Sequence, residues 1–280
     1  MTLIRPEGVW QSVDYRLTSA TTGAIMDDAA PKQLTILCPP LPGGPHLLLA
    51  FTGLAQAPDG TPMLRWIRET IRGEQRTIEA LLDHLRNRLT RDIGHSHLRN
   101  YGLVLVGGVF ENHGKRTYFQ ISNIEAVSNA IRPIFECTVT EIKRPELFLA
   151  GAGRRSVAAS DIDVVNKEST MKPVTWEHHL DLLAQVNRRA AERDKQLDPA
   201  GVGTVSPWCH VTYLAENEDG GKGRDFRESG DPAKELSLET VVAGIDFTDS
   251  MRVFLARTKG APLTDTDMDE AIRRGLKGRP

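Results

Sequence analysis

Hydrophobic residues recur with a helical period in three segments of the chain. Residues 78–89 place isoleucine and leucines on one face, with arginine, glutamate, aspartate and asparagine between them. This spacing is typical of an amphipathic helix. The same pattern runs over residues 176–190, where Thr175 is a candidate cap, and more briefly over residues 64–71, after the start signal Thr61-Pro62. We therefore predict two consecutive helices and one later, longer helix.

Short apolar or β-branched runs between turn residues predict strands. They lie at residues 9–18, 33–38, 47–51, 103–109, 117–121, 135–142, 147–150 and 205–214. The order of elements is then strands, two helices, strands, one long helix and strands. Such grouping is typical of an α+β fold rather than of alternating βαβ units.

The C-terminal part of the chain has a different character. Residues 215–235 are polar and rich in glycine, with one proline, which predicts a loop or linker. Residues 241–247 and 251–256 are predicted to form a hairpin, and residues 264–275 a short polar helix. We expect the region 236–280 to be a C-terminal hairpin with a short helical tail.

Composition excludes several classes of protein. The chain has 280 residues, of which 40% are hydrophobic and 26% charged, as in ordinary globular proteins. With 35 basic and 37 acidic residues the formal net charge is −2, so we expect no nucleic-acid partner. No apolar run approaches the roughly 20 residues that cross a bilayer, and the N-terminus lacks the apolar region of a secretory signal. We expect no membrane partner and a cytoplasmic location.

The three cysteines predict buried, reduced thiols. Cys38, Cys137 and Cys209 are odd in number and lack CxxC spacing, which argues against a disulfide framework or a zinc site. Ser206, Cys209 and His210 lie close together in sequence. Alternation along a strand would place Cys209 on the face opposite the other two side chains, so a reactive Cys–His pair is not predicted.

Motifs for nucleotides and metals are incomplete. Residues 151–155 begin with GxG, but Ser156 stands where GxGxxG requires its third glycine. The glycines at 220–223 lack the spacing of a phosphate-binding loop. The histidine pairs at 95–97 and 178–179 have no further ligand at a spacing typical of a metal site. We expect no metal and no cofactor.

Three segments near the N-terminus carry a more specific pattern. Residues 13–18 contain Asp-x-Arg-x-Thr, Lys32 opens the next strand, and the following apolar strand ends in Gly53. This pattern resembles the N-terminal nucleophile (Ntn) hydrolase family and, within it, the proteasome β-subunit and HslV-like branch. Further segments continue the resemblance in the same order: the hairpin at 107–121, the Gly-rich turn at 149–153, the Arg-Asp at 193–194 and the strand at 205–214.

The resemblance covers residues 1–214 and implies a fold for them. In that family two antiparallel sheets face each other and helices lie outside, which makes a four-layer αββα sandwich. We therefore expect one Ntn-hydrolase-like domain over residues 1–214. The resemblance also implies a peptide or amide substrate, if the chain is catalytic, and assembly into a homo-oligomer.

The resemblance also implies roles for individual residues. A threonine at a free N-terminus is the nucleophile and, through its own α-amine, the base, because that amine titrates at about pH 8. Thr2 is the only candidate, exposed if Met1 is removed. Lys32 would lower the pKa of the hydroxyl, Asp14 would orient Lys32, and the backbone N–H at Gly53 would stabilise the oxyanion. The supporting residues would be Arg16, Thr18 and Asp194.

The sequence departs from the family in two respects. An early turn shortens the first strand, so that Thr2 would pair opposite Gln11, about 10 Å along the strand from Asp14. In addition, Arg154 and Gln196 stand where serines are expected. Either the true start lies upstream or the site has decayed, and an ordinary ion-pair network around Asp14 is a further alternative.

Two functions therefore stay open at the level of the sequence. The first is a proteasome-like Ntn amidohydrolase or peptidase of the threonine type, with an intact or an impaired site. The second is a non-catalytic binding or scaffold protein that keeps the fold and uses its charged cleft for a partner.

Overall fold

Two β-sheets form the centre of the molecule. The computed structural model describes residues 1–18, 24–28, 30–40, 44–74, 76–111, 114–170, 175–199, 201–215, 222–226 and 239–246. Within these residues, one sheet has five strands in the order β10-β1-β2-β11-β12, and all neighbours are antiparallel. Its strands are β1 (Thr2–Arg5), β2 (Gly8–Asp14), β10 (Glu146–Phe148), β11 (Cys209–Ala215) and β12 (Lys222–Phe226).

The second sheet has seven strands in the order β14-β13-β5-β6-β7-β8-β9. All neighbours in it are antiparallel except β13 and β5, which run parallel. Its strands are β5 (Gln33–Leu37), β6 (His46–Gly53), β7 (Leu103–Phe110), β8 (Arg116–Ile124), β9 (Ile131–Glu141), β13 (Glu239–Val242) and β14 (Ile245–Asp246). Two short strands, β3 (Leu17–Thr18) and β4 (Ile25–Asp27), pair separately.

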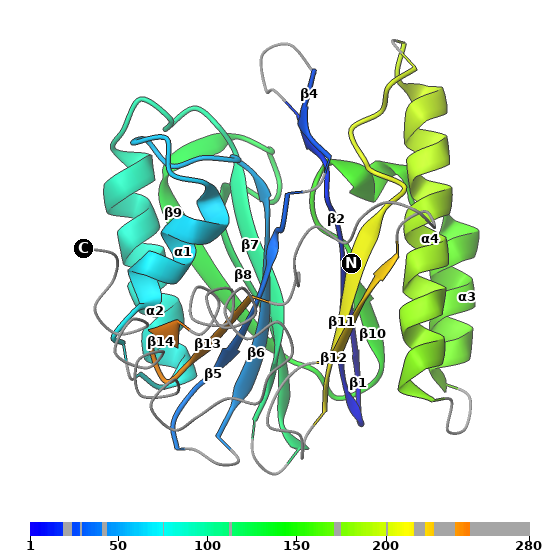
Figure 1. Ribbon diagram of the computed structural model, residues 1–280, viewed down its shortest axis with the longest axis horizontal. Coiled ribbons are helices and arrows are strands. Elements are labelled where there is room, and N and C mark those ends of the chain that lie inside the picture. Colours follow the sequence, from blue (N-terminus) through cyan, green and yellow to red (C-terminus); the bar gives the residue numbers. More distant parts are fainter. Residues whose placement is uncertain are drawn as a thin grey trace, which may run out of the picture.

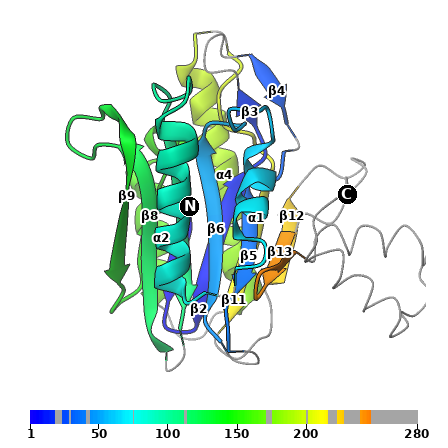
Figure 2. The same cartoon turned by 90° about the vertical axis from the view of Figure 1, so that its left-hand side faces the viewer.

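Helices pack against both sheets (Figure 1). α1 (Met63–Ile71) and α2 (Ile78–Leu89) share an apolar core with the seven-stranded sheet. α3 (Ala159–Thr170) and α4 (Trp176–Leu197) share another with the five-stranded sheet. A third apolar cluster joins the two sheets, with Ile4, Val9 and Leu214 packed against residues such as Leu48 and Val106. Figure 2 shows β9 at one edge of the seven-stranded sheet and β13 toward the other.

The chain is thus an α+β protein with two main sheets, as the order of elements predicted. The three predicted helices form α1, α2 and α4. Thr77 caps α2 by accepting a hydrogen bond from the backbone N–H of Ala80. Thr175 occupies the N-cap position of α4, but its side chain makes no capping hydrogen bond. Pro62 is the N-cap residue of α1 rather than its first helical residue.

Several details of the structure differ from the predicted elements. Residues 241–247, predicted as one strand, contain the turn between the antiparallel strands β13 and β14, and residues 9–18 divide between β2 and β3. α3 was not anticipated, because Val165 is the only apolar residue it buries fully and a helical period is therefore hard to see. Residues 222–226, inside the expected loop or linker, form β12, because their backbone pairs with β11 despite their polar side chains. β11 begins at Cys209 rather than at 205, which leaves Ser206 outside the strand.

Cys38 and Cys209 are buried free thiols, as predicted, whereas Cys137 on the edge strand β9 is only half-buried. Burial raises the pKa of both Cys38 and Cys209 to about 12. The predicted strand at 251–256, the predicted helix at 264–275 and most of the expected linker lie outside the described residues. None of the helices in the described ranges is both long and apolar enough to cross a membrane.

Candidate functional site

Asp14 and Lys32, which are distant in sequence, meet beside the ends of β2 and β5. The Lys32 ammonium lies 3.2 Å from the Asp14 carboxylate, and only 9% of the Lys32 side chain is exposed. The ammonium also donates a hydrogen bond to the backbone carbonyl of Arg16. The backbone N–H of Arg16 in turn donates to the Asp14 carboxylate at 2.9 Å. Lys32 is therefore held as a charged donor by a carboxylate and a carbonyl.

Arg16 joins this centre to a loop that follows α4. Its guanidinium makes two hydrogen bonds to the Asp28 carboxylate, each 2.9 Å long. It also donates to the backbone carbonyls of Val202 at 2.9 Å and Gly203 at 3.2 Å. The hydrogen bonds from Arg16 hold the pKa of Asp28 below its ordinary value. The side chain thus ties the end of β2 to the α4–β11 connection.

Asp194, near the end of α4, organises the same connection. Its carboxylate accepts hydrogen bonds from the Ser156 hydroxyl at 2.8 Å, the Thr204 hydroxyl at 2.9 Å and the Val205 backbone N–H at 3.1 Å. The Thr204 backbone N–H is a fourth donor. Burial acts to raise the pKa of Asp194, but the hydrogen bonds from Thr204 and Ser156 prevail and the pKa is lowered.

Ser156 is a residue that sequence reasoning missed. A serine was expected directly after Gly153, where Arg154 stands. The short 3-10 helix Ala152–Ser156 instead carries Ser156 back to Asp194. A search for a serine within one helical turn of the Gly-rich segment would have found it. Position 196, where the second serine was expected, is glutamine.

Gly53 ends β6 in a conformation that favours glycine. Its φ is +106°, and a Cβ atom there would lie 2.1 Å from the carbonyl oxygen of Gly102. Lys32 lies beside the same end of β6, where its backbone carbonyl accepts a hydrogen bond from the Phe51 N–H at 3.1 Å. Thr18 lies in β3, opposite Ile25 in the small two-stranded sheet.

Thr2 lies apart from the Asp14–Lys32 centre. It pairs with Gln11 in the register expected from the short first strand, three residues along β2 from Asp14. Its side chain is 2% exposed, and its hydroxyl accepts a hydrogen bond from the Gln11 amide at 3.1 Å. Gln33 donates to the Gln11 side chain at 2.9 Å, and Thr212 donates to Gln33 at 3.0 Å. Thr2 therefore belongs to a buried polar network that joins the two sheets.

The α-amine of Met1 lies just before β1, and the negative charge of Asp14 acts on it. It donates a hydrogen bond to the Ser12 carbonyl at 2.8 Å. Burial lowers its pKa from 8.0 to about 6, although the Asp14 carboxylate acts in the opposite direction. As an N-terminus, Met1 thus presents a largely neutral amine near pH 7. Its thioether side chain is not a nucleophile for acyl transfer.

Within the described ranges, no group of three or more histidine, cysteine, aspartate or glutamate side chains is arranged to hold a metal ion. The charged centre is instead built from direct contacts between basic side chains, carboxylates and backbone carbonyls. Lys32 and Arg16 are each paired with a carboxylate, so the centre is a charge-balanced network that holds the Lys32 ammonium in a fixed position.

Comparisons with solved structures found similar chains. The structure matches Anbu, the ancestral β-subunit, from Yersinia bercovieri over 94% of this chain and 98% of that chain, with 14% identity and a TM-score of 0.48. It matches Anbu from Hyphomicrobium sp. strain MC1 over 94% and 98%, with 10% identity and a TM-score of 0.47. A helical assembly of the Anbu complex from Pseudomonas aeruginosa matches over 100% and 98%, with 13% identity and a TM-score of 0.39.

No family model and no curated protein sequence matches the chain. Identities of 10–14% and TM-scores below 0.5 assign no activity to it.

Proposed function

We propose that residues 1–214 form a four-layer αββα sandwich of the Ntn-hydrolase type, in the proteasome β-subunit and HslV-like branch. Two features support this. The apolar cluster around Ile4 and Leu48 lies between the sheets while helices cover their other faces. The contact between Asp14 and Lys32 follows the pattern that the family resemblance implied. The C-terminal segment adds β13 to the edge of the second sheet.

On this fold we propose a non-catalytic binding or scaffold protein, in which Thr2 is not a nucleophile. The observation that carries the proposal is the hydrogen bond from Gln11 to the Thr2 hydroxyl, in the strand register that separates Thr2 from Asp14. A nucleophile and its activator must come within about 3 Å of each other. Three residues along a strand amount to about 10 Å, so Lys32 cannot activate Thr2 without a shift of β1 against β2.

A second candidate is the Ntn amidohydrolase or peptidase. It is favoured by the Asp14–Lys32 contact, because Asp14 and the Arg16 carbonyl hold the Lys32 ammonium in place, as the family resemblance implies for the lysine of a catalytic site. The substrate would be a peptide or another amide.

A direct test measures turnover and covalent capture by the purified protein. The intact mass and N-terminal sequence are determined before and after incubation with a threonine-reactive peptide epoxyketone, and hydrolysis of fluorogenic peptide amides is followed. We expect no adduct and no turnover, because the Thr2 hydroxyl is bonded to Gln11 inside the protein. Turnover abolished by both Thr2→Ala and Lys32→Met would overturn the proposal.

Two further variants make this result specific. Thr35→Val removes another buried hydroxyl, one without a hydrogen-bond partner among the described residues, and serves as the matched control. Turnover that survives Thr2→Ala but is lost in Lys32→Met would also contradict a non-catalytic function, because it would indicate a different nucleophile at the same centre. Circular dichroism confirms that each variant is folded.

We also propose that the chain assembles with copies of itself through the β9 edge. β9 is the last strand of the seven-stranded sheet among the described residues, and its Ile134 and Val139 side chains are 58% and 56% exposed. An edge strand with exposed apolar residues is a template for pairing, whereas lysine on an edge prevents it.

Val139→Lys is therefore expected to shift the protein toward the monomer in sedimentation velocity at micromolar concentration. The control is Val164→Lys on α3, where the wild-type side chain is also exposed, at 40%. Equal sedimentation of the wild type and Val139→Lys, or an equal effect of Val164→Lys, would argue against β9 as the interface.

A further inference from the structure

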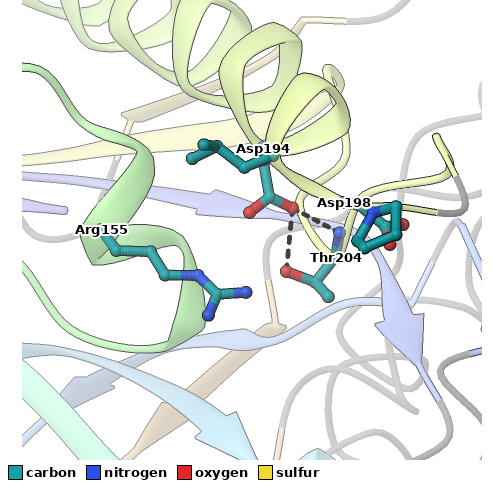
Figure 3. A pocket seen from close by; sticks show the side chains of 6 residues that line it. Arg155, Asp194, Asp198 and Thr204 are labelled. Carbon is teal, nitrogen blue, oxygen red and sulfur yellow. Dashed lines mark hydrogen bonds between the residues drawn. The ribbon is translucent and has the colours of Figure 1, made fainter.

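A pocket opens beside Asp194, on the side of the α4–β11 connection (Figure 3). Its volume is about 470 Å³. Arg155 from the 3-10 helix faces Thr204 across it, and the end of α4 supplies the remaining wall. The residues that line it are Arg155, Asp194, Leu197, Asp198, Pro199 and Thr204.

The two carboxylates of the pocket are already engaged. Asp194 accepts four hydrogen bonds, from Ser156, Thr204 and Val205. Asp198 accepts the backbone N–H groups of two residues in the following loop, at 3.1 and 2.8 Å. Donors that are directed at a carboxylate spread and offset its negative charge. The aspartates therefore form part of the wall and are poorly placed to bind a cation.

Arg155 is the cation of this pocket. Its side chain is exposed, and within the described residues no hydrogen bond or ion pair engages its guanidinium. In Figure 3 the guanidinium points into the space toward Thr204. A guanidinium presents paired N–H donors that match a carboxylate or a phosphate in a two-point contact. The Arg155 guanidinium can therefore bind an anionic group that enters the pocket.

The rim of the pocket is apolar. Leu197 is 65% exposed at the end of α4, and Pro199 follows it after one residue. An exposed leucine and proline next to an arginine that has no partner among the described residues suit a ligand with an apolar group adjoining its anionic group. A free inorganic anion would leave this apolar surface unused.

From these observations we infer that the pocket binds the carboxylate of an apolar amino acid at the end of a peptide or of a similar acylated compound. Arg155 binds the carboxylate, and Leu197 with Pro199 contacts the apolar side chain. The site is distinct from the Asp14–Lys32 centre, but the two are connected. The loop that Asp194 and Asp198 hold also supplies the Val202 and Gly203 carbonyls to Arg16.

The inference is tested by titrating the full chain with N-acetyl-L-leucine and following backbone amide signals by NMR. We expect saturable binding in the millimolar range, as befits a small ligand in an open pocket, with the largest shifts at Thr204 and Val205. N-acetyl-L-leucinamide, which lacks the carboxylate, should bind at least tenfold more weakly. Inorganic phosphate should also bind more weakly, because it cannot use the apolar rim.

Arg155→Gln is expected to weaken binding of N-acetyl-L-leucine at least tenfold. Arg154→Gln is the matched control, because Arg154 is an exposed neighbour on the same 3-10 helix but does not line the pocket, and its effect should stay below twofold. A second variant, Leu197→Glu, places a negative charge at the rim and should weaken binding independently.

Several results would overturn the inference. These are unchanged affinity in Arg155→Gln, equal loss in Arg154→Gln, or binding of the leucinamide as tight as that of the acid. Tighter binding of inorganic phosphate than of N-acetyl-L-leucine would also contradict it. Unfolding curves of the variants confirm that a loss of binding is not a loss of folded protein.

Discussion

Replacement of Asp246 by alanine is expected to lower the free energy of unfolding by about 3–5 kcal/mol. Asp246 in β14 is 1% exposed and lies 3.6 Å from the Arg68 guanidinium and 3.0 Å from that of Arg72. Arg68 is 4% exposed and also lies 3.2 Å from Glu239 in β13. Removal of Asp246 takes one carboxylate from the buried Arg68 and from Arg72 at the end of α1, and Glu239 alone would then face Arg68 in place of two carboxylates. Leaving desolvated positive charge with less compensation is costly.

Urea unfolding followed by circular dichroism measures this effect. The matched control is Glu69→Ala, which breaks the Arg65–Glu69 pair on the same helix, where both side chains are more than 40% exposed. That substitution should cost less than about 1 kcal/mol, because water screens the pair. A similar small cost for Asp246→Ala would show that β13 and β14 do not depend on these buried charges for their attachment to α1.

A second large effect is expected in the pH dependence of stability, through His179. This side chain is fully buried, and the guanidinium of Arg5 hydrogen-bonds to its ring. Burial, together with the positive charge of Arg5, lowers the pKa of His179 from 6.5 to about 4. The unfolded chain therefore takes up a proton near pH 6.5, whereas the native protein does so only near pH 4.

Between these two pH values the unfolded state binds more protons, so stability is lost as the pH falls. A shift of this size corresponds to about 3 kcal/mol. In His179→Gln the residue cannot titrate, while its amide oxygen still accepts a hydrogen bond from Arg5. The difference in unfolding free energy between the wild type and His179→Gln should therefore change by about 2–3 kcal/mol from pH 7.5 to pH 4.5, in favour of the variant.

His178→Gln provides the control for this measurement. His178 is the adjacent residue, but its side chain is 44% exposed and pairs with Glu168 at the surface. Its pH profile should run parallel to that of the wild type within about 1 kcal/mol. If His179→Gln and the wild type lose stability equally between pH 7.5 and pH 4.5, His179 is not held neutral in the native protein.

Features carried by local patterns could be predicted from the sequence. The period of residues 78–89 predicted α2, because a helix buries every third or fourth side chain whatever lies opposite. The short loop after Ile4 predicted the pairing of Thr2 with Gln11, because the register of a hairpin follows from its turn. The family pattern predicted that Asp14 orients Lys32, and the two side chains are in contact in the structure, while their catalytic roles stay a prediction.

Other features depend on contacts between distant segments. β12 has a polar sequence and exists as a strand because β11 offers it a backbone partner, with Asp225 bonded to His210. The Ser156 hydroxyl reaches Asp194 because the chain turns through the 3-10 helix Ala152–Ser156. The sequence was thus sufficient to predict elements whose apolar side chains repeat regularly along one helix or strand. The pairing partners of polar strands, the contact between Ser156 and Asp194 and the position of Arg155 beside the pocket depend on how the segments pack. No short stretch of sequence contains both sides of those contacts.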